Sequence, residues 1–404
     1  MPKKPEGNTP NDVVELLRSM IRFDTVTPRD SGRSDAEHAL AGWLHGLAES
    51  WGFATRWLPV DGFSPNLLVT CEVDPSAPWW LFDSHLDTVG VEGMTIDPFG
   101  GDLRDVDAGG GQEPRILGRG ACDTKGTGAA MLWALRDTRD AGALAANAAV
   151  LFTVCEEDHQ QGAVAFVERG LDEIGWRPDA VVVGEPTGMQ AVAASNGFVR
   201  WKLRTLGAAA HSSTPERGHN AILDMAHAVQ WLQERHVGPA NNAPDPHPLT
   251  GGGSCSINVI RGGAQCNIVP ETCEVAVDQR VPPGREPRDE IATVETLMAE
   301  LADRHAGLRW EITNIETAPP FDSPPSRRLA DRTAAFLRDA SIASSVVGAP
   351  YTTNANHYAA AGLPCVVLGP GDIAMAHTKA ESIGVAQLRE GVTGYAAMMR
   401  ERPA

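Results

Sequence analysis

The stretch AAVLFTVCEED, residues 148–158, decides how the rest of the chain is interpreted. Its first eight residues form an almost unbroken apolar run of strand length, which is typical of a strand buried on both faces of a parallel sheet. Three acids, Glu156, Glu157 and Asp158, follow at once. A buried strand that ends in acids predicts a site at the carboxyl edge of an α/β sheet, where such sheets bind ligands.

The same pattern extends outward from this strand in both directions. Alternating apolar runs and helical spacing predict a mostly parallel α/β sheet with helices packed on it. Before residue 190 we expect strands at 66–73, 79–82 and 179–184, and helices at 13–21, about 36–51, 124–140 and about 161–171. After residue 318 we expect helices at 327–340 and near 355–361, strands at 344–347 and 364–368, and a last helix from Val385.

A different pattern separates these two parts. Between residues 191 and 317 the expected order is strand 198–206, helix 220–236, strands 255–260 and 273–280, helix 286–303 and strand 308–315. This β-α-β-β-α-β order is typical of a ferredoxin-like domain. We therefore expect residues 1–190 and 318–404 to form one domain, into which residues 191–317 are inserted as a second.

Composition narrows the possible partners. The 404 residues suffice for two or three domains, and 34 basic against 52 acidic residues give a net charge of −18, which argues against nucleic acid and anionic membranes as partners. Seven cysteines without a Cys-x-x-Cys pair argue against a disulfide framework or a thiolate zinc site. The start is polar and no run of eighteen apolar residues occurs, so a cytoplasmic location is expected.

Five segments place His, Asp or Glu just after an apolar strand or in the following loop. They are residues 84–87, 121–123, 155–158, 184–187 and 376–378. Imidazole and carboxylate ligands suit zinc or a related divalent ion, and two histidines with three carboxylates suit two metals that share one carboxylate. The sequence contains neither His-Glu-x-x-His nor Gly-x-Ser-x-Gly, and residues 118–126 fit no nucleotide-binding fingerprint.

These segments resemble the M20 metallopeptidase family, which includes acetylornithine deacetylase, succinyl-diaminopimelate desuccinylase, aminoacylase and glutamate carboxypeptidase. The resemblance runs in order from about Val13 to the C-terminus, through residues 85–89, 97–99, 118–126, 156–157, 184–187, 210–213, 220–222, 267–270, 369–371 and 376–377. It implies an α/β fold, with a zinc-peptidase-like catalytic domain and an inserted ferredoxin-like α+β domain that serves as lid and dimerisation domain.

The resemblance also implies a role for each matching residue. Asp123 corresponds to the carboxylate that bridges two divalent metals, most simply zinc, for which cobalt or manganese can substitute. The other implied ligands are His85 and Glu185 for one metal, and Glu157 and His377 for the other. Glu156 corresponds to the general base, and Asp87 to the acid that orients His85. His211 corresponds to a donor supplied by the partner subunit of a homodimer, and Asn267 and Arg280 to substrate-binding groups.

The expected function is hydrolysis of the amide bond of an N-acyl amino acid with a free carboxylate. A dipeptidase or carboxypeptidase of the same family is the alternative, which would take short peptides, and a non-catalytic metal-binding protein is the remote one. Simpler roles stay open for single residues: Asp87 as a cap, Asn267 as a strand-end amide, Arg280 as a surface ion pair and His357 as a structural histidine.

Three positions depart from the family pattern. Ser84 replaces a glycine before His85, Asn354 stands where an acid is usual, and Glu381 is the one acid kept in residues 379–381. We expect the changes at 354 and 379–381 to lie where substrate binds, which would disfavour a cationic substrate such as acetylornithine.

Overall fold

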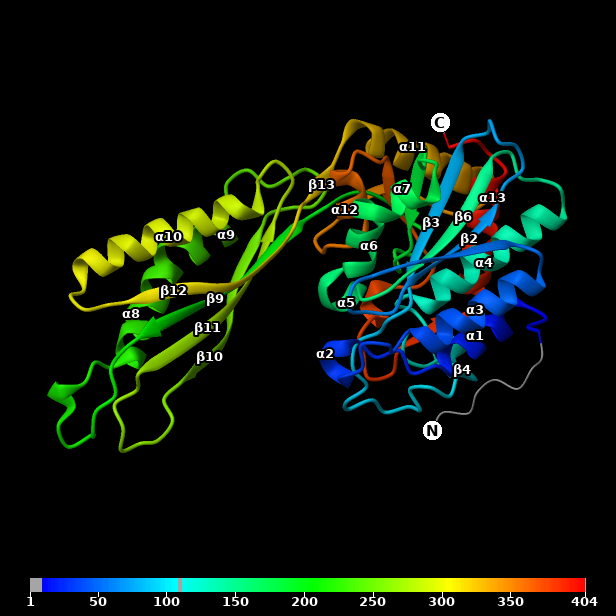
Figure 1. Cartoon of the computed structure of the whole chain (residues 1–404). Helices are drawn as coiled ribbons and strands as arrows, with labels where there is room; N and C mark the ends of the chain where they lie inside the picture. Colours follow the sequence, from blue (N-terminus) through cyan, green and yellow to red (C-terminus); the bar gives the residue numbers. More distant parts are fainter. Residues whose placement is uncertain (1–8, 108–110, 404) are drawn as a thin grey trace. The chain divides into compact units, whose positions relative to one another are not determined.

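The computed structural model describes residues 9–107 and 111–403, and the chain divides into two compact units (Figure 1). Unit 1 comprises Met1–Ala193, Ser323–Val347 and Thr353–Ala404, and unit 2 comprises Ala194–Asp322 and Gly348–Thr352. Each unit has its own sheet and its own core. No helix in the described part of the chain is long and apolar enough to cross a membrane.

A mixed sheet forms the centre of unit 1. Its strands follow the order β1 (Ala54–Leu58), β2 (Asn66–Cys71), β6 (Asn147–Thr153), β3 (Trp79–His85), β7 (Ala180–Val183), β15 (Cys365–Val367) and β8 (Ala191–Ser195). The neighbours β6, β3, β7 and β15 run parallel, and β1, β2 and β8 pair antiparallel. Every residue of β3, β6 and β7 is buried, which explains their apolar runs, although β3 ends in the polar residues Asp83, Ser84 and His85. The mostly parallel α/β sheet is confirmed.

Helices surround this sheet. They are α1 (Val13–Ile21), α2 (Pro28–Ser31), α3 (His38–Ser50), α4 (Lys125–Asp140), α5 (Glu156–His159), α6 (Gln161–Ala165), α7 (Leu171–Ile174), α11 (Pro324–Asp339), α12 (Ala355–Ala360) and α13 (Val385–Met399). The Asp12 carboxylate accepts the backbone N–H of Glu15 and so caps α1, and α4 packs against both α1 and α13. A π-helical turn, Phe166–Gly170, divides the helix expected at 161–171.

The sequence patterns miss several strands of unit 1. A small separate sheet joins β4 (Asp102–Asp107), β5 (Gln112–Leu117) and β16 (Ser382–Gly384). β4 is rich in acids and β5 contains a proline, so neither resembles a buried strand. Two short strands pair with β8: β13 (Phe321–Asp322), which was also not expected, and β14 (Val346–Ala349), which corresponds to the strand expected at 344–347.

Unit 2 is an antiparallel sheet covered by helices. The strand order is β10 (Ser254–Gly262), β11 (Thr272–Val281), β9 (Gly197–Leu206) and β12 (Trp310–Ala318). In chain order this is 2-3-1-4, which is the ferredoxin-like arrangement, so that expectation is confirmed. Helices α8 (Ala221–Leu232) and α10 (Pro287–Arg304) close the core against β9, β11 and β12, and the short α9 (Gly238–Asn241) lies between the expected helix 220–236 and the expected strand 255–260.

Candidate metal centre

The expected ligands converge at one edge of the unit 1 sheet. His85 ends β3, Glu157 follows β6 as the second residue of α5, and Glu185 follows β7. Because β6, β3 and β7 are parallel neighbours, their carboxyl ends meet at the same edge. Asp123 comes from the turn before α4, and His377 from the loop before β16.

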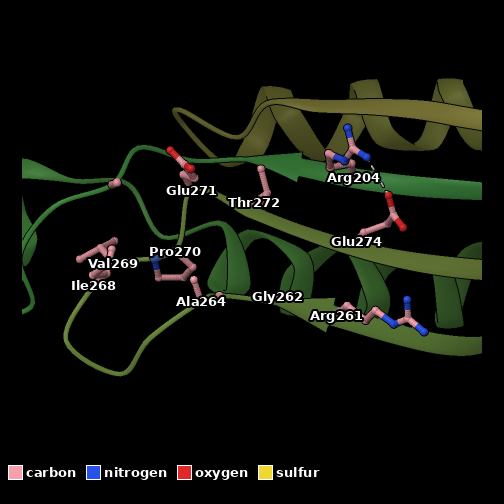
Figure 2. Close-up of a pocket in the computed structure, with 12 residues that line it drawn as sticks. Arg204, Arg261, Gly262, Ala264, Ile268, Val269, Pro270, Glu271, Thr272 and Glu274 are labelled. Atoms are coloured by element: carbon pink, nitrogen blue, oxygen red, sulfur yellow. Dashed lines mark hydrogen bonds and ion pairs between the residues drawn. The ribbon is translucent and has the colours of Figure 1, made fainter.

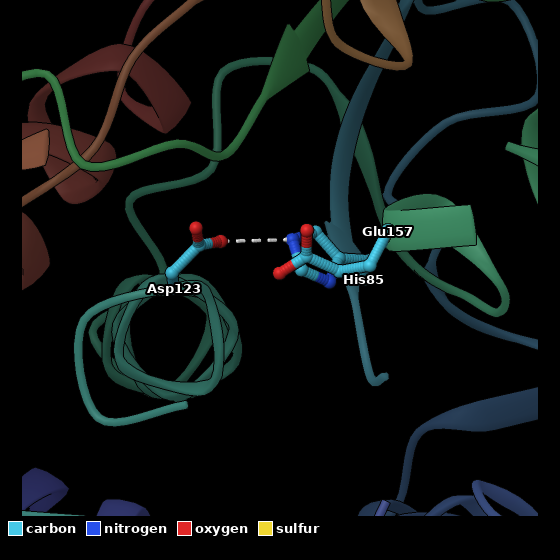
Figure 3. A group of neighbouring side chains, drawn as sticks. All are labelled: His85, Asp123 and Glu157. Atoms are coloured by element: carbon cyan, nitrogen blue, oxygen red, sulfur yellow. Dashed lines mark hydrogen bonds and ion pairs between the residues drawn. The ribbon is translucent and has the colours of Figure 1, made fainter. Parts of the chain in front are cut away.

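Asp123 lies at the centre of this group. Its Oδ1 is 3.1 Å from His85 Nε2, and its Oδ2 is 3.2 Å from His377 Nε2. His377 Nε2 also lies 3.0 Å from Glu157 Oε1. Figure 3 shows Asp123 pointing from the start of α4 toward His85 and Glu157. The two carboxylate oxygens of Asp123 therefore face two different histidines, as a carboxylate shared between two cations requires.

Two sets of three residues bring potential ligand atoms within 4.8 Å of one another. One is His85, Asp123 and Glu157, and the other is His85, Glu156 and Glu185. The second set contains the two residues expected to hold one metal, His85 and Glu185, together with the residue expected to be the general base.

Burial and mutual repulsion disfavour the ionised forms of the carboxyl groups in this site. Burial, together with the charge of Glu157, raises the pKa of Glu156 to about 8, although His85 opposes the change. Burial and the nearby charge of Asp123 raise the pKa of Glu157 to about 7 and that of Glu185 well above its ordinary value. Burial alone would also raise the pKa of Asp123, but hydrogen bonds from His377 and His85 hold it below its ordinary value.

The donor set fits divalent cations. The group combines the buried imidazole of His85, the more exposed imidazole of His377 and several carboxylates, and these are the donors that zinc and related ions prefer. Hydrogen bonds to Asp123 and Glu157 raise the pKa of His377 to about 11. Glu156, Glu157 and Glu185 therefore bind protons readily, and so does His377. Divalent cations at the same place would replace those protons.

Asp87 orients this site in a way that the sequence did not reveal. His85 Nδ1 donates to the backbone carbonyl of Asp87 at 3.0 Å, and the Asp87 carboxylate is farther away, at 3.5 Å. The carboxylate instead accepts the backbone N–H groups of Glu156 and Glu157, each at 3.0 Å. Asp87 therefore leaves His85 Nε2 free to act as a ligand and also fixes the backbone of the two glutamates.

A second buried acid fixes Asp123. Glu381 Oε1 accepts the backbone N–H groups of Cys122 and Asp123, each at 3.0 Å, and Glu381 Oε2 pairs with Arg119 at 2.6 Å. Arg119 also donates to the carbonyl of Gly90. Neither Arg119 nor the role of Glu381 was predicted, because nothing in the local sequence links an acid to backbone groups more than 250 residues away.

The structure corrects the expectation that Asn354 and Glu381 lie where substrate binds. Glu381 is fully buried beneath Asp123. Asn354 is 1% exposed, and its Nδ2 donates to Asp83 Oδ2 at 2.9 Å and to Thr153 Oγ1 at 3.0 Å. Both side chains support the sheet edge from inside, so neither residue disfavours a cationic substrate. Ser84 is likewise buried in β3, where its hydroxyl bonds to Thr124.

Three expected site residues lie in unit 2. His211 is exposed, and its Nδ1 bonds to the Ser213 hydroxyl at 2.7 Å. Asn267 is also exposed, and its carbonyl accepts the N–H of Ser212. Arg280, on β11, pairs with Asp278 at 2.9 Å. Within unit 2, His211 and Asn267 are therefore close neighbours in space, and Arg280 has a carboxylate partner of its own chain.

Unit 2 also contains a hollow of about 530 Å³ (Figure 2). It is lined by residues 261–264 and 268–272 and by Arg204, Ala209 and Glu274. Arg204 is already paired with Glu274 and with Glu311, so it offers no free cation to a ligand. None of the expected metal ligands lines this hollow.

Comparisons with known proteins identify the family of the chain. The sequence profile of Peptidase family M20/M25/M40 matches residues 81–401. Acetylornithine deacetylase of Pectobacterium atrosepticum is 30% identical over 389 residues, which cover 93% of this chain and 94% of that protein.

Solved structures show the same fold. An M20 family metallo-carboxypeptidase from Sulfolobus solfataricus superimposes with a TM-score of 0.78 at 16% identity, over 98% of this chain and 100% of that chain. A dinuclear metal-binding peptidase of the M20 family from Bacillus subtilis gives a TM-score of 0.67 at 14% identity, over 96% of both chains.

Proposed function

The chain belongs to peptidase family M20/M25/M40 and is a metal-dependent hydrolase akin to acetylornithine deacetylase; on that premise we propose that it cleaves the amide bond of N-acyl amino acids with a free carboxylate. The observation that carries the proposal is the position of Asp123, whose two oxygens face His85 and His377. Glu156 lies beside this group, where a general base is needed.

Five side chains would hold two divalent cations. In the proposal His85 and Glu185 hold one, Glu157 and His377 hold the other, and Asp123 bridges them. The ions are most simply zinc, with cobalt or manganese as substitutes, because imidazole and carboxylate donors suit all three. Such ions would polarise the amide carbonyl and lower the pKa of a water molecule toward neutrality.

Glu156 would act as the general base. Burial and the charge of Glu157 raise its pKa to about 8, which supports its role as a proton acceptor. It would take a proton from the attacking water and deliver it to the leaving amine, so that one residue serves both steps. Asp87 would support this role because it holds the backbone N–H of Glu156.

Unit 2 would contribute to substrate binding. We assign His211 as the donor to the substrate carbonyl, supplied by the partner subunit of a homodimer, and Asn267 and Arg280 as groups that bind the substrate. Arg280 could hold a carboxylate with two parallel hydrogen bonds, although it would first have to leave Asp278.

Exposed apolar side chains and a sheet edge in unit 2 support the homodimer. Ile260, on the edge strand β10, is 61% exposed, and Leu223, on α8, is 60% exposed. The edge strand of a sheet and exposed apolar side chains are both features that a second copy can cover. A monomeric mass by light scattering would remove the assignment of His211 to a partner's site.

The seven free cysteines support a reducing, cytoplasmic location.

A dipeptidase or carboxypeptidase activity is the second candidate, because the fold matches that of an M20 carboxypeptidase. One panel of substrates tests both candidate activities. Purified protein with zinc, cobalt or manganese is given N-acetyl amino acids, N-succinyl amino acids and dipeptides. Release of the acyl group from the first two supports the deacylase, whereas cleavage of dipeptides alone would replace it with the peptidase.

A further inference from the structure

Glu156 is held by two side chains outside the ligand set. Gln160 Nε2 donates to Glu156 Oε1 at 3.0 Å, and His357 Nε2 donates to Gln160 Oε1 at 2.8 Å. We propose that Gln160 and His357 are positioning residues that fix the orientation of the Glu156 carboxylate. This inference rests on the proposed function, in which Glu156 moves the proton.

The direction of each hydrogen bond follows from what each group can donate. In its ionised form, in which it acts as a base, Glu156 can only accept, so Gln160 turns its NH₂ group toward Glu156 and its oxygen toward His357. That oxygen needs an N–H, so His357 must carry its proton on Nε2. Burial lowers the pKa of His357 to about 4, and the ring is therefore neutral at pH 7, with a single N–H.

The surroundings hold Gln160 in place. Its side chain is 5% exposed, and its backbone has a positive φ of 54° between α5 and α6. His357 comes from α12, almost 200 residues away, so the contact depends on the complete fold of unit 1. A free glutamine side chain has three rotatable bonds, and the bond from His357 selects one orientation of its amide.

Two neutral side chains, Gln160 and His357, suit the position next to Glu156 better than charged side chains would. A lysine or arginine next to Glu156 would compete with cations for the carboxylates of the site. The Gln160 amide instead binds one oxygen of Glu156 and adds no charge. With Oε1 anchored in this way, Oε2 is the oxygen that remains for the attacking water, and a rotated carboxylate would be a poorer base.

The first test compares kcat and KM for Gln160→Met, His357→Leu and His357→Gln. Gln160→Met keeps the side-chain length without the amide, so kcat should fall about tenfold with KM within about twofold. His357→Leu should lower kcat by a smaller factor and should have no further effect in the Gln160→Met background. His357→Gln should restore activity, because the Nε2 of glutamine can take the place of the imidazole Nε2. Gln161→Met, the same change one residue away, is the control and should behave as wild type.

The second test does not depend on activity. ¹⁵N NMR of the histidine rings reports which nitrogen carries the proton, and His357→Gln identifies the His357 signal. We expect a neutral ring with its proton on Nε2, and a shift of that signal in Gln160→Met.

Three results would overturn the inference: a proton on Nδ1, an unchanged kcat in Gln160→Met, or an effect of His357→Leu that persists without Gln160. If wild type cleaves no substrate, the proposed function fails. The NMR result still decides whether this chain of hydrogen bonds exists.

Discussion

Replacing Asp87 with asparagine should weaken the orientation of the site without removing any of the proposed metal ligands. Asp87 is fully buried, and each of its two oxygens accepts one backbone N–H, from Glu156 and from Glu157. Asparagine keeps one acceptor and turns an NH₂ group toward the other N–H. One hydrogen bond to a charged group is lost, at a cost of about 1.5–3 kcal/mol. The two glutamates should then shift at the backbone.

This loss translates into a measurable change in metal binding and rate. At 1.36 kcal/mol for each factor of ten, about 1.5–3 kcal/mol corresponds to roughly a 10- to 150-fold decrease in kcat/KM. Metal affinity should fall about 10- to 100-fold, as it does when a residue that supports a metal ligand is changed. The free energy of unfolding of the metal-free protein should change less, because the substitution also removes the repulsion that Asp87 exerts on Glu37 and Glu156.

The assay is a metal titration followed by initial rates at saturating metal. Asp158→Asn is the matched control, since Asp158 is also buried but pairs with Arg29 outside the ligand set. It should stay within about threefold of wild type, a difference of less than 1 kcal/mol. A kcat/KM for Asp87→Asn within the same range would refute the reasoning.

Three further predictions follow from the same contacts. Glu381→Gln should leave buried Arg119 without its charge partner and so lower the free energy of unfolding by about 3–5 kcal/mol. It should also weaken metal binding, and a metal affinity equal to that of wild type would contradict this. His357 has a pKa of about 4 in the folded protein against 6.5 when exposed, so acid favours the unfolded chain. Between pH 7 and pH 5 wild type should lose about 2 kcal/mol more stability by urea unfolding than His357→Gln, and equal losses would exclude that cause. Removal of metal with a chelator should lower Tm, because each cation at 100 times its Kd contributes about 2.7 kcal/mol; an unchanged Tm would argue against the site.

The convergence of the site could be predicted from the sequence because it follows from strand order. Buried parallel strands appear as apolar runs, and their carboxyl ends share one edge, so residues just after them become neighbours. His85, Glu157 and Glu185 follow this rule directly. The roles assigned to these residues stay proposals, since geometry shows only that they lie together.

The supporting contacts could not be predicted in the same way. Glu381, Asn354 and His357 each bond to a residue that lies some 200 or more positions away in the chain. Local periodicity carries no information about such pairs. The expectation that Asn354 and Glu381 lie where substrate binds rested on their departure from the family pattern, whereas burial places both side chains beneath the site. The strands β4 and β5 were missed because their polar faces do not show the alternation of a half-buried strand.

The most direct test of the account is Glu156→Gln, measured for metal content and for hydrolysis of N-acyl amino acids beside wild type. The account predicts two divalent ions in each chain for both proteins, hydrolysis by wild type, and a loss of kcat of at least about 10²-fold in Glu156→Gln. No bound metal in wild type, or undiminished hydrolysis by Glu156→Gln, would contradict the central claim.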